Sequence, residues 1–181
     1  MLGQIMDALE KNGQARNTLL IATGDNGAAR RPYPPLREAK SSIYEGGHRE
    51  PFVARWPSKI KPGTVSHSII CLNDFFATCA DILKADLPAN AAEDSVSFLP
   101  SLLNKKYAPV REAIINQASE GLAIRQGFWK YIVFRNGTRE LYNLKEDISE
   151  TNNLVSKNTE VVNRLEKLMQ SYFARGRSTP G

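Results

Sequence analysis

The side chains best suited to binding a metal or an anion lie between residues 25 and 48. The first are Asp25-Asn26, which are followed by Gly27. A carboxylate and an amide oxygen side by side are hard oxygen ligands that suit Ca²⁺ or Mg²⁺. Two ligands are too few by themselves, because Ca²⁺ takes roughly six to eight oxygens. A short polar stretch of this kind is also a common turn, so the residues alone leave both interpretations open.

The second group is Lys40 together with Gly46-Gly47-His48. The ammonium group of Lys40 could hold an anionic oxygen as a compact point charge. The glycine pair permits backbone geometry that other residues resist. His48 could give or take a proton, although a lone histidine in a loop is usually a surface residue. Each feature has an ordinary structural explanation when it is taken singly.

The elements around Asp25-Asn26 predict half of an α/β unit. Apolar residues at helical spacing in residues 1–11 predict an amphipathic helix rather than a signal peptide. The unbroken apolar run at residues 18–23 predicts a strand covered on both faces, as in a parallel sheet. Asp25-Asn26 would then lie at the carboxyl end of this strand, where open α/β sheets bind their ligands.

Further along, the pattern predicts a strand at residues 51–56 and an extended segment at residues 65–70. An apolar stripe predicts a helix from about residue 72 to residue 83. We expect Cys71 and Cys79 to be two small buried thiols on this helix. They cannot form a disulfide there, because eight residues of helix separate them by about 12 Å.

A short helix is expected at residues 98–103, and the sequence pattern changes from about Val110. Short strand-like runs follow, and Asn136-Gly137 predicts a hairpin turn between two of them. A final helix is expected over residues 159–175. Short antiparallel strands packed on one long helix make a small α+β subdomain.

The charge of the chain is modest but unevenly placed. The net charge is +5, and residues 25–61 hold eight Arg or Lys against four acids, which gives +4. We expect no nucleic-acid partner, because the basic residues are not interleaved with aromatic ones. An anionic small molecule or polysaccharide fits the charge. No apolar run reaches membrane-spanning length, so no membrane partner is expected.

Taken in order, these pieces resemble the formylglycine-dependent sulfatases of the alkaline-phosphatase-like superfamily. The resemblance covers essentially the whole chain. Its pieces are Asn17-Thr18-Leu19, Asp25-Asn26-Gly27, Lys40, the stretch from Tyr44 to Pro51, Arg55-Trp56-Pro57, Ala123-Ile124-Arg125, Trp129-Lys130, the stretch from Glu140 to Leu144, Glu150 and Asn153-Leu154.

The resemblance implies an α/β fold in two parts. Residues 1–107 would be an incomplete alkaline-phosphatase-like sheet region, and residues 108–181 a carboxy-terminal α+β subdomain. Asp25 and Asn26 would be the late ligands of an active-site cation, usually Ca²⁺, with Mg²⁺ as the alternative. Lys40 would be the catalytic lysine that binds the sulfate. His48 would contact the substrate without transferring a proton.

The chain also departs from the family pattern. The family nucleophile is a formylglycine made from Cys or Ser in Cys/Ser-x-Pro-x-Arg, and neither Cys71 nor Cys79 begins such a motif. We therefore expect the carboxy-terminal portion of a sulfatase that is inactive by itself and acts, within a larger protein, on a sulfated small molecule or polysaccharide. Family analogy suggests a secreted, periplasmic or lysosomal compartment. The oligomeric state is not predicted.

Two other functions stay open at this stage. The first is a phosphodiesterase or phosphonate hydrolase of the same superfamily, which would share the logic of the metal site. The second is a non-catalytic module that only binds sulfated glycans.

Overall fold

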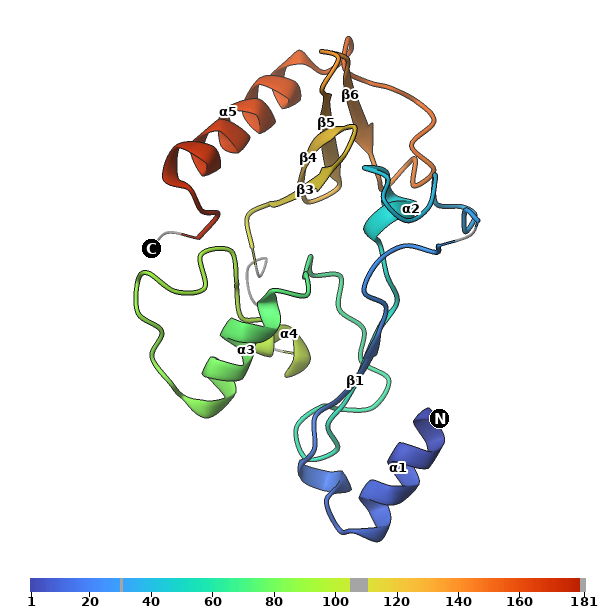
Figure 1. Ribbon diagram of the computed structural model, residues 1–181, viewed down its shortest axis with the longest axis vertical. Coiled ribbons are helices and arrows are strands. Elements are labelled where there is room, and N and C mark those ends of the chain that lie inside the picture. The colour runs from blue at the N-terminus through green and yellow to red at the C-terminus, as the bar shows by residue number, and fades with distance from the viewer. Residues whose placement is uncertain (30, 105–110, 180–181) are drawn as a thin grey trace.

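A four-stranded antiparallel sheet, a separate two-stranded ribbon and five α-helices make up the part of the chain that the structure describes (Figure 1). The structure is a computed structural model, and it describes residues 1–29, 31–104 and 111–179. The predicted domain boundary at residues 107–108 lies outside these residues. The helices are α1 (Leu2–Lys11), α2 (Glu45–His48), α3 (Asp74–Leu83), α4 (Leu99–Leu102) and α5 (Thr159–Arg175). The strands are β1 (Leu20–Thr23), β2 (Phe52–Arg55), β3 (Ile114–Ala118), β4 (Gly121–Gln126), β5 (Trp129–Phe134) and β6 (Arg139–Asn143).

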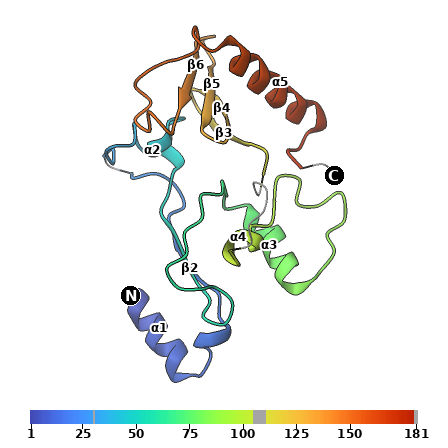
Figure 2. The same cartoon turned by 180° about the vertical axis from the view of Figure 1, so that it is seen from behind.

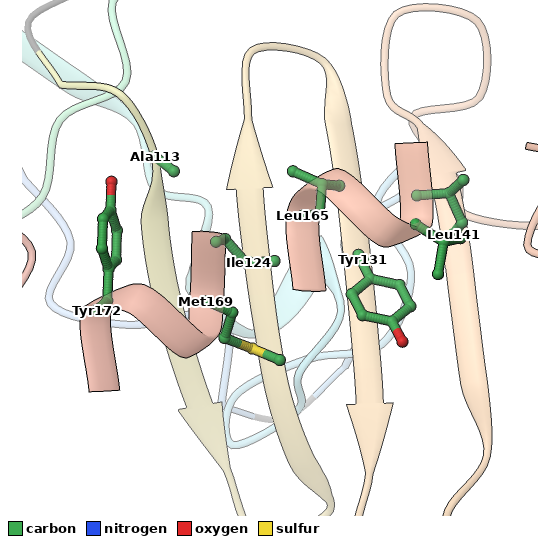
Figure 3. Close-up of a cluster of buried hydrophobic side chains, with 8 residues drawn as sticks. Ala113, Ile124, Tyr131, Leu141, Leu165, Met169 and Tyr172 are labelled. Carbon is green, nitrogen blue, oxygen red and sulfur yellow. The ribbon is translucent and has the colours of Figure 1, made fainter. Parts of the chain in front are cut away.

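The larger sheet is a meander in the order β3-β4-β5-β6, and α5 covers one of its faces. Ile124 of β4 is paired in register with Tyr131 of β5, which is paired with Leu141 of β6. Side chains alternate between the faces of a strand, so these three point to the same side. There they pack against Leu165 and Met169 of α5, as Figure 3 shows. This is the predicted α+β subdomain.

The opposite face of this sheet is covered by the segment just before α2. Ala123, Ile132 and Tyr142 alternate with the residues that face α5, and they pack against Ile43 and Tyr44. Both sheet faces are therefore buried, and a segment from far earlier in the chain forms one of the two covers. This packing joins the region of the predicted site residues to the carboxy-terminal sheet.

The hairpin between β5 and β6 forms at Asn136-Gly137, as predicted. Gly137 has a φ of 85°, a left-handed conformation that favours glycine. Its backbone N–H donates to the carbonyl of Phe134, and the N–H of Thr138 donates to Oδ1 of Asn136. Local turn chemistry thus sets the register of the two strands.

The strand predicted at residues 18–23 forms as β1, but its predicted parallel-sheet environment is wrong. Within the described residues β1 pairs only with β2, antiparallel, with Leu20 opposite Arg55. An apolar run is typical of a strand in a parallel sheet but does not specify the partner strand, and β1 is only half-buried within the described residues. The extended segment expected at residues 65–70 is not a strand.

Helix α1 is amphipathic, as predicted, and lies at the end of the molecule opposite the four-stranded sheet (Figures 1 and 2). It buries no residue, and Leu2 and Ile5 are each 44% exposed. A salt bridge of 3.0 Å between Glu10 and Arg55 ties it to β2. No helix among the described residues is both long and apolar enough to cross a membrane.

Helices α3 and α4 are held against β2 by three aromatic rings. Phe75 of α3 lies 6.3 Å from Phe52 of β2 and 5.4 Å from Phe98, centroid to centroid. The expectation for the cysteines is wrong in two respects. Cys71 precedes the helix instead of lying in it, and Cys79 is exposed, because α3 buries the turn around Ala77. Both thiols are free.

The core under α5 gives a direct test of this packing. Leu165 is fully buried, so Leu165→Ala should lower the free energy of unfolding by about 2 to 5 kcal/mol. Asn163→Ala changes an exposed residue of the same helix and should cost no more than about 0.5 kcal/mol. Urea unfolding followed by circular dichroism measures both. Equal midpoints for the two variants would show that α5 does not cover the sheet.

Candidate functional site

The turn that carries Asp25-Asn26 follows β1 directly and is docked on α2. Asp25 is exposed, and Nδ2 of Asn26 donates to its Oδ1 at 2.6 Å. The N–H of Gly27 donates to the carbonyl of Gly47 at 2.9 Å. A Cβ at Gly27 would lie 1.9 Å from the carbonyl oxygen of Gly46, so only glycine permits this approach. Backbone contacts thus fix the turn on the helix.

The loop that carries Lys40 joins the same unit. The N–H of Lys40 donates to the carbonyl of Ala28 at 3.1 Å, and the N–H of Gly46 donates to the carbonyl of Arg37 at 2.9 Å. The Lys40 side chain is exposed. Among the described residues its ammonium group has no hydrogen bond or salt bridge. The structure therefore brings the loop of Lys40 and the turn of Asp25 together on α2.

Glu45, the first residue of α2, is a buried carboxylate surrounded by three cations and one histidine. It is 1% exposed. Its Oε1 lies 3.1 Å from Nζ of Lys130 and 3.3 Å from Nε2 of His48. Its Oε2 lies 3.1 Å from Arg49 and 3.2 Å from Arg125. The Glu45 carboxylate thus orients one residue of α2, the C-cap residue of α2 and two residues of the sheet.

Lys130 connects this carboxylate to a second one. Its Nζ lies 2.8 Å from Oε1 of Glu150, and Lys130 and Glu150 are both at most 1% exposed. The other oxygen of Glu150 accepts the backbone N–H of Glu45 at 2.7 Å. This buried lysine of β5 thus links α2 to the loop after β6, and each of the three charged groups has a partner of opposite charge. Removing one partner of such a group typically costs about 3 to 5 kcal/mol.

The environment shifts the pKa values of the two carboxylates in opposite directions. Burial would raise the pKa of Glu45, but the hydrogen bond from His48 and the charges of Lys130 and Arg125 outweigh burial and hold it well below its usual range. Burial raises the pKa of Glu150, against the opposing charge of Lys130. Glu45 is therefore the firmly ionised member of the pair.

A second set of contacts lies beside the group formed by Glu45, Lys130 and Glu150. It is centred on Arg37, which precedes Lys40 in the chain. Its guanidinium lies 3.7 Å above the ring of Tyr44, and Nη1 donates to the carbonyl of Glu150 at 2.7 Å. The hydroxyls of Tyr44 and Tyr142 both donate to Oε2 of Glu140 at 2.8 Å. Burial and the hydrogen bond to Glu140 raise the pKa of both tyrosines. These hydroxyls are therefore structural donors.

A groove of about 790 Å³ runs beside this unit. It is lined by Asp25 from the turn, by His48 and Arg49, and by Arg125 and Phe128 from the sheet. Neither Asn26 nor Lys40 is part of the lining. The groove therefore holds two of the four residues predicted from the sequence, and the other two lie on the adjoining turn and loop.

The donor atoms at the end of β1 suit a hard cation but make only part of a site. No hydrogen bond among the described residues uses Oδ2 of Asp25 or Oδ1 of Asn26, so two oxygens are open to a ligand. Glu50 packs over Gly24 beside them, and burial together with the charge of Asp25 raises its pKa. The described residues contain no group of three or more His, Cys, Asp or Glu placed to hold a metal.

Three of the residues that position this site received no role from the sequence. Arg125, Lys130 and Glu150 were recognised only as parts of matching motifs. One available signal is Lys130, a charge inside the apolar strand Trp129–Phe134. A charged residue in a strand with two covered faces needs a buried partner. The sequence does not show which of the acids is that partner.

The low pKa of Glu45 predicts how stability depends on pH. A carboxylate with a lowered pKa stabilises the fold above its ordinary pKa of about 4.5 and loses that contribution as the pH falls below it. Glu45→Gln should therefore lower the free energy of unfolding by about 3 kcal/mol at pH 7. Its difference from the wild type should shrink steadily between pH 4.5 and pH 3.

Urea titrations at several pH values measure this difference. Glu146→Gln removes the same charge from an exposed position and should match the wild type throughout. A difference for Glu45→Gln that does not change with pH would contradict an ionised Glu45.

Comparison with known proteins identifies relatives of this chain. Residues 1–85 match the family model described as Sulfatase. The chain is 35% identical to N-acetylgalactosamine-6-O-sulfatase of Bacteroides thetaiotaomicron over 205 aligned residues, which cover 96% of this chain and 40% of that protein. The chain thus spans about two fifths of the length of this relative.

Solved structures give the same result. A structure described under the metabolism of multiple glycosaminoglycans by Bacteroides thetaiotaomicron has a TM-score of 0.82 at 36% identity, over 93% of this chain and 41% of its own. A structure described as a complex with its substrate D-glucosamine-2-N,6-O-disulfate has a TM-score of 0.78 at 25% identity, over 99% of this chain and 39% of its own.

One neighbour has a different activity. The phosphonate monoester hydrolase of Agrobacterium radiobacter has a TM-score of 0.68 at 22% identity, over 97% of this chain and 38% of its own. At this identity the likeness concerns the fold alone. The fold expected from the sequence, an α/β region of the alkaline-phosphatase-like type with a small α+β subdomain, is confirmed by these neighbours. With the family model, the sequence relative and the fold in agreement, the chain belongs to the sulfatase family.

Proposed function

We propose that this chain is part of a sulfuric ester hydrolase, to which it supplies two metal ligands and a sulfate-binding lysine. The observation that carries this proposal is the single unit formed by the turn of Asp25-Asn26, the loop of Lys40 and α2. Hydrogen bonds from Gly27 to Gly47 and from Lys40 to Ala28 hold the unit together. One unit would thus carry a pair of oxygen ligands and an ammonium group that has no partner among the described residues, which would suit binding of a sulfate beside a cation.

Lys40 would bind an oxygen of the sulfate. Its exposed ammonium group has no internal partner among the described residues, so its charge is available to an anion. During hydrolysis negative charge develops on the transferred group, and a fixed cation stabilises it. The backbone contact of Lys40 with Ala28 would hold the lysine beside the metal ligands while its side chain reaches the substrate.

His48 would contact the substrate from the groove without acting as an acid or base. Its Nε2 is engaged by Glu45 at 3.3 Å, so only the other edge of the ring is open to a ligand. Glu45 is in turn held by Lys130. We assign His48 to binding, because the buried carboxylate orients the ring.

Asp25 and Asn26 would hold Ca²⁺, with Mg²⁺ as the alternative. When bound, the cation would neutralise charge on the sulfate and polarise the attacking group. The remaining ligands would come from outside the described residues, because these contain no larger cluster of acids, histidines or cysteines. The formylglycine nucleophile would also come from elsewhere in the protein, since no Cys/Ser-x-Pro-x-Arg occurs in this sequence.

The proposed substrate is a sulfated sugar. Support comes from the N-acetylgalactosamine-6-O-sulfatase relative, at 35% identity, and from the neighbour solved with glucosamine disulfate. The excess of basic residues in the stretch from Asp25 to Lys61 suits such an anion. The phosphonate hydrolase hypothesis rests on a likeness of fold only, so we rank it second. A purely glycan-binding module remains a possible outcome of the experiments below.

Calcium binding tests the split metal site. The 181-residue chain should bind Ca²⁺ with a dissociation constant weaker than about 10 µM, because two protein ligands leave most of the coordination to water. Asp25→Asn should abolish measurable binding in isothermal titration calorimetry. Asp86→Asn removes the same charge from an exposed position elsewhere and should have no effect. Submicromolar affinity, or binding that survives Asp25→Asn, would contradict the proposed ligands.

The role of Lys40 can be tested by binding of 6-O-sulfated N-acetylgalactosamine to the 181-residue chain. Lys40→Ala should weaken binding about tenfold, the effect of losing one charge-assisted contact of about 1.4 kcal/mol. Lys59→Ala, an exposed lysine of the same basic stretch, is the control. Equal affinities for the two variants would refute the assignment.

The same preparation should not hydrolyse an aryl sulfate at any Ca²⁺ concentration. Measurable turnover would show that this chain contains its own nucleophile. Carrying the Lys40→Ala change into a longer protein that includes a Cys/Ser-x-Pro-x-Arg motif separates the remaining functions. Loss of aryl sulfate turnover would support a sulfatase, loss of aryl phosphate turnover alone would support the second hypothesis, and absence of either activity in the unchanged protein would support a binding module.

A further inference from the structure

Two arginines converge on one carboxylate oxygen in the wall of the groove. Nη1 of Arg49 and Nη1 of Arg125 lie 3.1 Å and 3.2 Å from the same Oε2 of Glu45. Arg49 comes from the C-cap of α2 and Arg125 from β4. The only other hydrogen bond of Arg125 among the described residues runs from Nε to the carbonyl of Gly127. Each guanidinium therefore keeps N–H donors free.

The charges around Glu45 do not balance. Within this ion-paired cluster two buried carboxylates, Glu45 and Glu150, face three permanent cations, Lys130, Arg49 and Arg125. Lys130 is buried between both carboxylates, so its positive charge is neutralised by theirs. The surplus positive charge falls on the two arginines, whose side chains are 46% and 20% exposed. Two guanidinium groups that share one oxygen repel each other, and a second anion would relieve that repulsion.

Both arginines line the groove. The groove is also lined by the carboxylates of Asp25 and Glu50, and Glu50 lies beside Gly24. Phe128, which is 52% exposed, also lines it and follows Gly127 in the turn between β4 and β5. An exposed ring beside free guanidinium donors offers an apolar surface and a charged clamp, which together suit an acidic sugar.

We propose that Arg49 and Arg125 form a subsite for a second anionic group, a carboxylate or a sulfate, on the sugar next to the one whose sulfate ester lies at Lys40. This subsite rests on the proposed function, because it extends the substrate bound at Lys40 into the adjoining groove. The preferred substrate is then an oligosaccharide that is acidic at two neighbouring sugars, and Phe128 packs against the second one.

The test measures binding of two tetrasaccharide probes to the 181-residue chain by isothermal titration calorimetry. The first probe alternates uronic acid with N-acetylgalactosamine and carries no sulfate. The second is its carboxyl-reduced derivative, sulfated on both sugar types. The variants are Arg49→Gln and Arg125→Gln, and Arg164→Gln is the control. Arg164 is exposed on α5, so its substitution removes the same charge away from the groove.

We expect each groove variant to weaken binding of at least one probe about tenfold, while Arg164→Gln leaves both affinities unchanged. An effect limited to the first probe identifies a carboxylate, and an effect limited to the second identifies a sulfate. Because Arg125 also supports Glu45, thermal unfolding is measured for its variant to detect a loss of stability. Arg49→Lys then tests the subsite independently of Arg125. It keeps the charge but loses the planar guanidinium, so it should bind the probes with intermediate affinity.

Two results would overturn the subsite. One is an Arg49→Gln variant that binds both probes as well as the Arg164→Gln control does. The other is a combination of two findings. The wild type would bind the first probe and its uncharged form, which is carboxyl-reduced and unsulfated, with equal affinity, and neither arginine variant would change the affinity for the sulfated probe. Failure of the proposed function is distinguishable, because Lys40→Ala would then leave the sulfated probe unaffected while the arginine variants still weakened the unsulfated one.

Discussion

The buried ammonium group of Lys130, held between Glu45 and Glu150, is the interaction on which the rest of the structure depends. It pairs with both carboxylates, at 3.1 Å and 2.8 Å, in a region that water does not reach. A buried charge without a partner is far more costly than a broken surface pair. Any other docking of the helix that begins at Glu45 would leave this charge unpaired, and the turn and loop bound to that helix are positioned with it.

This arrangement separates the residues that position the site from those that are proposed to meet a ligand. Glu45, Lys130 and Glu150 are fully buried, and the lysine forms an ion pair with each carboxylate. Asp25 and Lys40 are exposed on the same docked unit. The face of the sheet opposite α5 thus acts as the platform for the site, and α5 supplies the other cover that makes the platform rigid.

Local features of the fold were predictable from the sequence, and their environments were not. The hairpin at Asn136-Gly137 and the helix at residues 159–175 follow from turn chemistry and helical spacing, which act over a few residues. The strand at residues 18–23 was found, but its pairing was wrong because an apolar run does not specify a partner strand. Cys79 was expected to be buried, although small apolar residues lie on either side of a helix with equal ease.

By itself, the sequence determined the identity and order of the reactive side chains. Asp25, Asn26, Lys40 and His48 are oxygen, ammonium and imidazole groups whatever the fold, and their order carries the resemblance to sulfatases. Only the tertiary structure decided that Lys130, some eighty-five positions from Glu45, is its partner, and that Arg49 and Arg125 share one oxygen. Local sequence patterns cannot predict such pairs. A charge inside a strand indicates only that it needs a partner, and the packing of distant segments decides which partner it meets.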